Sequence, residues 1–360
     1  MKKKFIAFIL AACVGAACLP LIGGCKSNTD YTLKTDENGE KYYSVRCSGM
    51  SNSLKGEYVI PEEYGEGEDK APVREIEQEG FSGTSLTKIT IPKTVTKIGN
   101  AAFAYNNSLA EVVFDGESGL EEISRGAFGY CYGLREITLP QSVKSIGYMA
   151  FYNCTALSEI TFPAGLEEIG GAAFQDCVAL TGVELPDGLT TIGEVAFYGT
   201  SLNSIIIPGS LRDKVVPVLG EDGEQKKDEN GNPVTETVYG LGVGAFHSCT
   251  ELTLAVIEEG VKTIASGAFG YCTALKTVYL PASLEKIDGA FYRNGKFYTG
   301  HAFHSDNAIT DLYYAGTQQQ WAVLENNIVK EPVNVSNYKY SNDSLLSSSV
   351  VRRYEAQYNK

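Results

Sequence analysis

The feature that most constrains the fold of this chain is an internal repeat with a period of 23 residues. An Ala-Phe pair occurs four times in succession at this step, at residues 127–128, 150–151, 173–174 and 196–197. A unit of this length is one supersecondary element that cannot bury its apolar face alone, so neighbouring units must stack. The chain is therefore expected to form a solenoid, whose length is not limited by a single core.

One complete unit indicates how each turn of the solenoid is built. Residues 134–140 alternate apolar and polar side chains and end in proline, which predicts a strand with one buried face. Proline ends the strand because it has no N–H to give to a ladder. Residues 143–147 form a second short apolar segment that ends in a turn-permitting glycine. The pair Ala150-Phe151 then places a small residue beside a large one in the core.

Aligned on the phenylalanine, the chain contains nine units, and the first of them is degenerate. The anchoring residues are Phe81, Phe103, Phe128, Phe151, Phe174, Phe197, Phe246, Phe269 and Phe303. Two stretches interrupt the repeats, at 212–243 and at 288–299. The first stretch has strand-like runs on both sides of an Asn-Gly pair at 230–231, so a protruding β-hairpin is expected there.

The pattern L-x-x-I-x-[IL]-P, followed by V-x-x-I-G-x-x-A-F-x-x-C, resembles the BspA-like family, the Treponema pallidum type of leucine-rich repeat. The resemblance runs from about residue 58 to residue 321, and residues 313–321 look like the closing segment of that family. It implies a leucine-rich-repeat solenoid that is β-rich, with short turns and 3-10 segments. It also implies a right-handed, curved array of about nine repeats of ~23 residues. Family members are typically surface or secreted proteins implicated in adhesion and protein interaction.

The first 25 residues resemble a bacterial lipoprotein signal peptide. Lysines at 2–4 are followed by an uncharged, mostly apolar stretch at 5–24 and then by Cys25. The resemblance implies that the Cys25 thiol carries a lipid and that the protein is extracytoplasmic, anchored to the cell membrane. A plain cleaved signal and an uncleaved anchor are the alternatives, because residues 5–24 are just long enough to span a bilayer.

Four regions are expected along the chain. They are a signal peptide at 1–25, a β-hairpin cap and linker at 26–57, the repeats at 58–320, and a closing segment with a polar tail at 321–360. The tail from about residue 333 is rich in serine, asparagine and tyrosine and is expected to be loosely ordered.

The charge of the chain excludes some classes of partner. The formal charge is −14, and residues 1–25 hold three lysines and no acid, so the remainder has 27 basic and 44 acidic residues, or −17. Such a surface repels nucleic acid and anionic membrane surfaces. It says little about protein or sugar partners, and no oligomer is implied.

No set of residues suggests catalysis, so the chain is not expected to be an enzyme or to hold a cofactor or metal. His301, His304 and Asp306 could in principle bind zinc, but His301 adjoins the Ala-Phe slot of its own repeat. The glycines at 240–244 lack the βαβ context of a dinucleotide loop, and residues 228–231 lack the ligands of a calcium loop. Both segments are interpreted as turns.

Six cysteines remain after the leader, and five of them follow the repeat. These five are Cys131, Cys154, Cys177, Cys249 and Cys272. Stacked side chains point the same way rather than at each other, so buried free thiols are expected instead of disulfides. Cys47 lies outside this column and has no obvious partner in the sequence.

Two stripes of side chains are candidates for recognition. The outward positions of the strands would form a ligand face: Lys88, Thr90, Glu111, Arg135, Glu136, Thr138, Glu159, Thr161, Lys276 and Tyr279. A line of tyrosines just after the phenylalanines would form an aromatic edge: Tyr105, Tyr130, Tyr152, Tyr198 and Tyr271. Tyrosine is enriched at interfaces, although both stripes could also be ordinary solvated surface.

The expected function is therefore adhesion or binding of a protein or glycan through the strand face, with the membrane reached only through the lipid. Two alternatives stay open. One is a structural envelope spacer with no specific ligand, and the other is a hydrolase of surface glycans.

Overall fold

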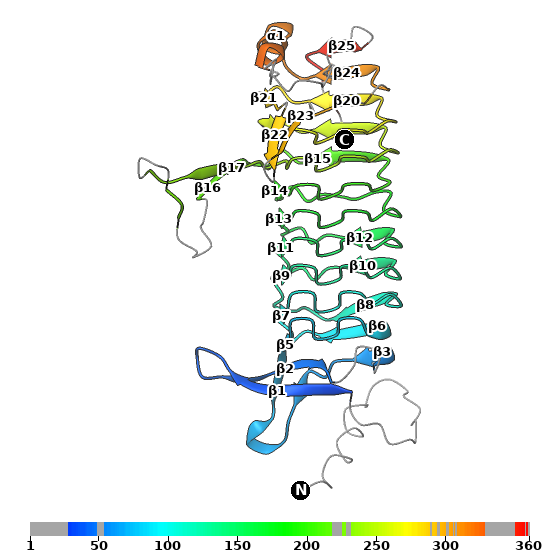
Figure 1. The fold of residues 1–360 in the computed structure, drawn as a ribbon, viewed down its shortest axis with the longest axis vertical. Coiled ribbons are helices and arrows are strands. Elements are labelled where there is room, and N and C mark those ends of the chain that lie inside the picture. The colour runs from blue at the N-terminus through cyan, green and yellow to red at the C-terminus, as the bar shows by residue number, and fades with distance from the viewer. Residues whose placement is uncertain are drawn as a thin grey trace.

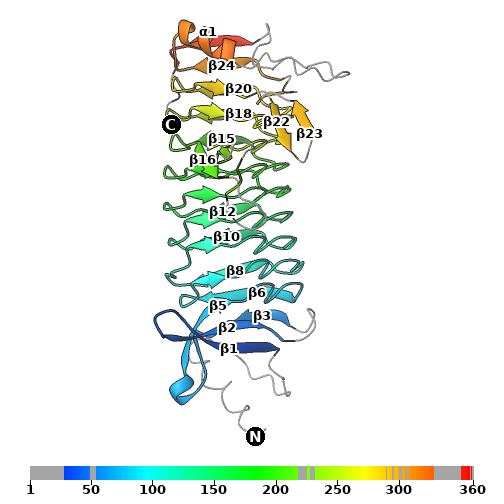
Figure 2. The ribbon, with the colours of Figure 1, turned by 60° about the vertical axis from the view of Figure 1, so that its left-hand side comes forward.

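The computed structural model describes residues 28–48, 54–217, 225–227, 232–288, 290–293, 296–299, 302–304, 306, 308–327, 350–356 and 358. The signal peptide with Cys25, His301 and the turn at 228–231 lie outside these residues. The described chain winds into a tall stack of coils (Figure 1). Seen from a second direction, the stack keeps one long axis with little bending (Figure 2). This confirms the predicted β-rich solenoid.

Each coil has three sides, and the first side carries the longer strands, which we call the strand face. Five of them pair in parallel in the order β12-β10-β8-β6-β3: β3 (Lys55–Val59), β6 (Ser85–Pro92), β8 (Glu111–Asp115), β10 (Glu136–Thr138) and β12 (Glu159–Thr161). Five more pair in parallel in chain order: β15 (Ser204–Ile207), β18 (Leu254–Ile257), β20 (Thr277–Leu280), β24 (Asp311–Tyr314) and β25 (Val351–Tyr354). The coil at 181–185 lies between the two sheets without a regular strand.

The second side carries strands of two residues. Four of them form one parallel sheet: β9 (Glu122–Ile123), β11 (Ser145–Ile146), β13 (Glu168–Ile169) and β14 (Thr191–Ile192). Two more pair further along the stack: β19 (Thr263–Ile264) and β21 (Lys286–Ile287). In each, the isoleucine faces the core, so the short segment needs only one apolar side chain per coil.

The third side carries the Ala-Phe pairs and is made of hydrogen-bonded turns. In one coil the N–H groups of residues 101, 103 and 105 donate to the carbonyls of residues 125, 127 and 129 of the next coil, at 2.8, 2.8 and 2.9 Å. The residues two before and two after Phe103 have φ of 53° and 61°. These left-handed residues aim alternate N–H groups at the next coil, which satisfies backbone that would otherwise be buried unpaired. Instead of the expected 3-10 segments, the described coils use these turns, and η1 (Gly67–Asp69) is a short 3-10 helix near the N-terminal end.

Nine phenylalanine rings form the centre of the core. All nine are fully buried, and successive rings are stacked with centroids 5.1–5.6 Å apart. Phe197 and Phe246 are 49 residues apart in the chain, yet their rings are 5.2 Å apart, like those of consecutive repeats. The ring column therefore continues past the insertion without a break.

The cysteine column holds free, buried thiols, as predicted. Each of the five repeat cysteines donates a weak hydrogen bond from Sγ to the carbonyl of the phenylalanine one coil earlier, at 3.1–3.2 Å. In an earlier coil Asn106 occupies this slot and donates to the carbonyls of Phe81 and Phe103 at 2.8 and 2.9 Å. Burial raises the pKa of the Cys131 and Cys177 thiols to about 12, so these groups stay protonated and unreactive.

Additional strands cover the N-terminal end of the stack. A five-stranded sheet contains β1 (Thr29–Thr35), β2 (Lys41–Cys47), β4 (Glu63–Tyr64), β5 (Ala71–Ile76) and β7 (Lys97–Ile98). β1 and β2 form an antiparallel hairpin, and β2 pairs in parallel with β5. The hairpin therefore shields the first buried coil from solvent.

Residues 328–349, which make up most of the tail expected to be loosely ordered, lie outside the described residues, but the last part of the tail differs from that expectation. β25 lies in the tail that was expected to be loosely ordered, but it pairs in parallel with β24 over four residues. The helix α1 (Gln318–Asn327) precedes it and buries Trp321, whose ring lies edge-on to Tyr314 at 5.5 Å. The polar composition of the tail does not reveal this strand, because its order comes from pairing with β24.

Both insertions contain antiparallel strand pairs. β16 (Lys214–Pro217) pairs with β17 (Thr235–Val238), and this pair projects sideways from the stack (Figure 1). β22 (Ala290–Arg293) pairs with β23 (Lys296–Thr299).

The ring column generates a prediction about stability. Replacing Phe151 with alanine removes a fully buried ring that is stacked on both sides, and it should lower the free energy of unfolding by about 3–5 kcal/mol. Urea denaturation followed by circular dichroism measures this change. Tyr148→Ala, an exposed aromatic in the same coil, serves as the control and should have a much smaller effect. Equal effects of the two substitutions would contradict the central role of the column.

Candidate functional site

Parallel register sorts the outward side chains of the strand face into two columns. One column contains Glu57, Lys88, Glu111, Glu136 and Glu159 in successive strands. The other contains Val59, Thr90, Val113, Thr138 and Thr161 at equivalent positions. The residues between the columns point into the core, because successive side chains on a strand face opposite ways. A ligand on this face would meet one charged column and one smaller, largely uncharged column.

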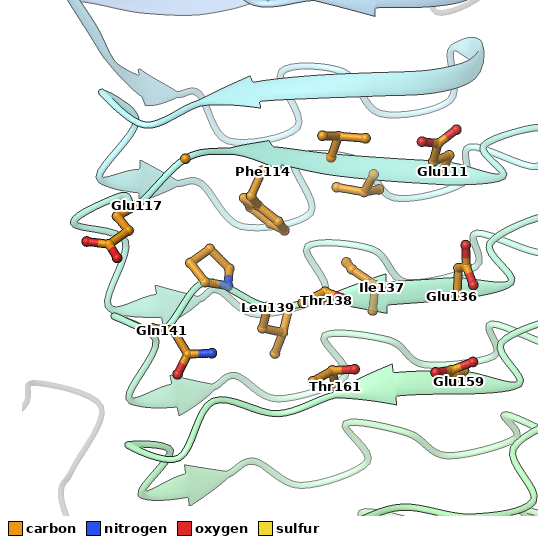
Figure 3. A pocket seen from close by; sticks show the side chains of 14 residues that line it. Glu111, Phe114, Glu117, Glu136, Ile137, Thr138, Leu139, Gln141, Glu159 and Thr161 are labelled. Atoms are coloured by element: carbon orange, nitrogen blue, oxygen red, sulfur yellow. The ribbon is translucent and has the colours of Figure 1, made fainter.

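A hollow of about 490 Å³ opens on the strand face over β8, β10 and β12. Residues from all three strands and from the loops after β8 and β10 line it (Figure 3). The lining includes three glutamates in successive strands, two threonines, and the half-buried ring of Phe114. The hollow therefore combines carboxylates, hydroxyls and one apolar contact.

A change in repeat length explains why the hollow is at this position. Phe103 and Phe128 are 25 residues apart, whereas each of the next three phenylalanine intervals is 23 residues. β8 pairs with β6 along five residues, but its register with β10 holds only one pair, Glu111 with Glu136. Beyond that pair the two strands diverge, and the loop that contains Gly116 and Glu117 forms the rim.

The charged column is unbalanced at the hollow. Lys88 forms an ion pair with Glu111 at 2.7 Å, and this bond raises the pKa of the lysine. Glu136 and Glu159 are both exposed and lie in register on adjacent strands. Among the described residues no cation forms an ion pair with either of them. Like charges directly opposite each other in a sheet are destabilising.

All ten residues of the predicted ligand face are at least partly accessible, but the structure does not bring them all together. Five of them line the hollow: Glu111, Glu136, Thr138, Glu159 and Thr161. Lys88, Thr90 and Arg135 lie on the same sheet or beside it, outside the hollow. Tyr279 belongs to β20 in the other sheet of the strand face, and Lys276 directly precedes that strand. There the Tyr279 ring stacks on Tyr313 at 4.4 Å, and the Arg353 guanidinium lies 4.9 Å from the centre of the Tyr313 ring.

Sequence reasoning missed several residues that line the hollow, among them Phe114, Glu117 and Gln141. The two extra residues between Phe103 and Phe128 were a signal that could have found them. An elongated repeat must either bulge outwards or separate its strand from the next one, and here the strands separate.

The predicted aromatic edge divides into two clusters. Tyr105 and Tyr130 stack at 4.7 Å, and Tyr152 lies edge-on to Tyr130 at 5.1 Å. Tyr198 stacks on His247 at 5.3 Å, and His247 lies 5.1 Å from Tyr271. The imidazoles of the second cluster were not anticipated from the sequence.

His247 and His304 meet over a glycine. Their ring centroids are 5.5 Å apart, and a side chain at Gly270 would collide with the His304 ring at 2.2 Å. Ser248 Oγ is 2.8 Å from His247 Nδ1. Burial and the nearby His304 lower the pKa of His247 from 6.5 to about 4, so this imidazole is neutral at pH 7.

Neither a metal-binding cluster nor a membrane-spanning helix is found in the described part of the chain. No cluster of three or more histidine, cysteine, aspartate or glutamate side chains in it could hold a metal ion. Its helices also lack the length and apolar character needed to cross a bilayer.

Comparison with known families gives a match over most of the chain. The family model described as the BspA type leucine-rich repeat region matches six copies, over residues 70–157, 105–213 and 233–318. The phenylalanine spacing predicts nine units, whereas the family model matches six copies. The number of repeats therefore stays a prediction. No curated protein matches the chain.

Several solved structures are similar to this chain. A leucine-rich cell surface protein of Faecalibacterium prausnitzii is 24% identical, with 86% of this chain and 98% of that one covered and a TM-score of 0.46. A leucine-rich repeat protein of T. pallidum is 21% identical, with 68% and 87% covered and a TM-score of 0.44. The pneumococcal vaccine antigen PcpA is 18% identical, with 84% and 95% covered and a TM-score of 0.35.

The unbalanced carboxylates generate a prediction about electrostatics. Glu159→Lys places a cation in register with Glu136, so it should raise the unfolding midpoint at low ionic strength. High salt should cancel the gain, because the pair is exposed. Thr161→Lys places the same cation on the same strand opposite Thr138, but removes no carboxylate, and serves as the control for a cation at a position without an acidic neighbour in register. A gain that is equal in the two variants, or unchanged by salt, would contradict the interpretation.

The buried imidazole generates a prediction about pH. In the unfolded chain His247 takes up its proton near pH 6.5, but in the folded chain only near pH 4, so acid favours unfolding across this window. The loss begins below about pH 6.5 and is complete below about pH 4. It should reach roughly 1–2 kcal/mol after allowance for partial solvent screening. His247→Phe keeps a ring against Tyr198 but does not titrate. Urea unfolding of both proteins between pH 7 and pH 4 should therefore show a shallower decline for the variant, and parallel curves would refute the assignment.

Proposed function

The chain belongs to the BspA-type leucine-rich repeat family, and from this premise we propose that it is an exported, membrane-tethered module that binds a ligand through its strand face. The leader with its basic start, apolar stretch and Cys25 supports export and lipid anchoring. The multiple acyl chains of such an anchor hold a protein firmly, whereas a single chain does so only marginally. The function proposed is adhesion or capture of a protein or glycan, without turnover.

The observation that carries this proposal is the pair of in-register carboxylates at the open hollow. Glu136 and Glu159 repel each other, although the same column shows, at Lys88, that a cation fits there. Local features that reduce stability without local compensation are typical of binding sites. β8 and β10 also diverge next to Glu136, and the half-buried Phe114 lines the hollow there. The carboxylates lower the stability of the fold at these positions, and this supports a role in ligand binding.

The chemistry of the hollow favours a ligand that brings positive charge. Two unpaired carboxylates attract lysine and arginine side chains, which protein surfaces carry in abundance. Thr138, Thr161 and Gln141 add hydroxyl and amide groups for hydrogen bonds, and Phe114 adds apolar contact. A basic protein surface is therefore the first ligand to seek, and amino-sugar glycans the second.

A binding screen tests the proposal. Residues 26–360, which contain every described element, are applied to arrays of proteins and glycans at low and at physiological salt. Binding of the unchanged protein to a true ligand should weaken as salt rises, and the combined change Glu136→Gln and Glu159→Gln should abolish it. Glu121→Gln with Glu122→Gln is the matched control, because it removes two exposed carboxylates from another side of the coil. Binding that survives the first pair of changes, or its absence across both arrays, would overturn the proposal.

A further inference from the structure

The hollow on the strand face is acidic at both of its ends. At one end Glu136 and Glu159 lie in register on β10 and β12. At the other end Glu117 lines the hollow from the loop after β8, on the far side from the two strand carboxylates (Figure 3). Glu117 is exposed, and among the residues that the structure describes no cation forms an ion pair with it. Two separate acidic points therefore border the same hollow.

The length of β8 gives the distance between these two ends. Glu111 is in register with Glu136 and marks the first end, and β8 continues from there to Asp115. A strand rises about 3.3 Å per residue, so Asp115 lies about 13 Å further along. Gly116, with φ of 82°, then turns the chain, and Glu117 follows at the rim. The two acidic ends are thus about 13 Å apart along the strand direction.

The lysines near the hollow already pair with other acids. Lys88 forms an ion pair with Glu111 at 2.7 Å. The side chain of Lys93 passes next to Gly116, but its ammonium pairs with Glu62 at 3.4 Å. The negative charge at both ends is therefore available to a ligand.

The floor between the two ends is uncharged. Thr138 and Thr161 supply hydroxyls, and the half-buried ring of Phe114 lies between β8 and β10 (Figure 3). Arg135 directly precedes β10 but does not line the hollow. The volume of about 490 Å³ is within the range of roughly 300–1,000 Å³ that is typical of ligand pockets. A complementary ligand is positive at two points and uncharged between them.

An extended peptide can supply this spacing of charge. Its side chains alternate, so residues i and i+4 face the same way and are about 13 Å apart. Residues i and i+2 also share a face but are only about 7 Å apart, and residues i and i+3 face opposite ways. In a helix, residues i and i+4 are separated by a rise of about 6 Å, which is too short to reach both ends. Arginine suits the end with two carboxylates, because its guanidinium carries five N–H donors in a fixed fork.

We propose that the hollow binds an extended peptide segment that runs along the strands and carries two basic residues four positions apart. One basic side chain, best an arginine, lies between Glu136 and Glu159, and the other pairs with Glu117. The residue midway between them is uncharged and lies over Thr138 and Phe114. The inference rests on the proposed function of the strand face, and it adds the conformation, direction and charge spacing of the ligand.

Fluorescence anisotropy of labelled peptides with the full chain, kept in a neutral detergent, tests the inference. Three peptides of seven residues, blocked at both termini, contain two arginines and otherwise serine and alanine. Their arginines are four, three or two positions apart, so the peptides share composition and charge and differ only in spacing. The peptide with a spacing of four should bind about fivefold more tightly than the other two, which reach only one acidic end at a time.

A single exposed carboxylate should control this preference. Glu117→Gln should reduce the difference between the peptides to less than about twofold, because it removes one acidic end and leaves the other. The affinity for the two peptides with shorter spacing should change little. Asp115→Asn is the matched control, since it removes an exposed carboxylate two residues away that does not line the hollow, and it should keep the preference.

The combined change Glu136→Gln and Glu159→Gln separates this inference from the proposed function. It should weaken the binding of all three peptides. Equal affinities in the unchanged protein, or a preference that survives Glu117→Gln, would overturn the inference and leave the strand-face function intact. The same holds if no peptide binds, but a glucosamine tetramer or a folded basic protein binds in a manner that depends on Glu136 and Glu159. If no peptide, sugar or protein binds at all, both proposals are overturned.

Discussion

The stacking of one phenylalanine ring per coil is the interaction on which the rest of the structure depends. No coil has enough apolar residues to form a core of its own, so each ring is buried only because the coils before and after it are present. The constant ring spacing of 5.1–5.6 Å fixes the rise of the whole stack, and the strands and turns must fit that rise. The insertion between Phe197 and Phe246 leaves the spacing at 5.2 Å, so extra residues are accommodated at the corners of the coil and not along the axis. The surface can therefore accept insertions without any change in the packing of the core.

The thiols and the left-handed residues both serve this stacking. A phenylalanine carbonyl at the centre of the stack needs a hydrogen-bond donor that is small enough to be buried between coils. Cysteine provides this in five coils, and Asn106 does so in another. The left-handed residues on either side of the phenylalanines from Phe81 to Phe269 turn alternate N–H groups towards the next coil. The repeat thus maintains three hydrogen-bonded sides at once.

Most of the fold could be predicted from the sequence, because a period of 23 residues leaves one architecture for the buried positions. The outward columns were also predictable, since the alternation along a strand fixes which residues face solvent. The hollow could not be predicted. The sequence shows two extra residues before Phe128, but it does not show that they separate β8 from β10. β25 was missed because its order comes from pairing with β24 and not from its own composition. The contact between His247 and His304 was not predicted. It depends on the lack of a side chain at Gly270, and this is visible only when the three coils are stacked.

The ladders between coils run along the axis of the stack, and this has a mechanical consequence. A force that pulls the two ends apart acts along the hydrogen bonds that join one coil to the next. It therefore loads the end coil first instead of shearing many strands together. Each coil that peels away replaces a rise of about 5 Å with an extended segment of up to roughly 75 Å for 23 residues. A solenoid held at one end and gripped at the other would lengthen step by step under load, and so act as a shock absorber.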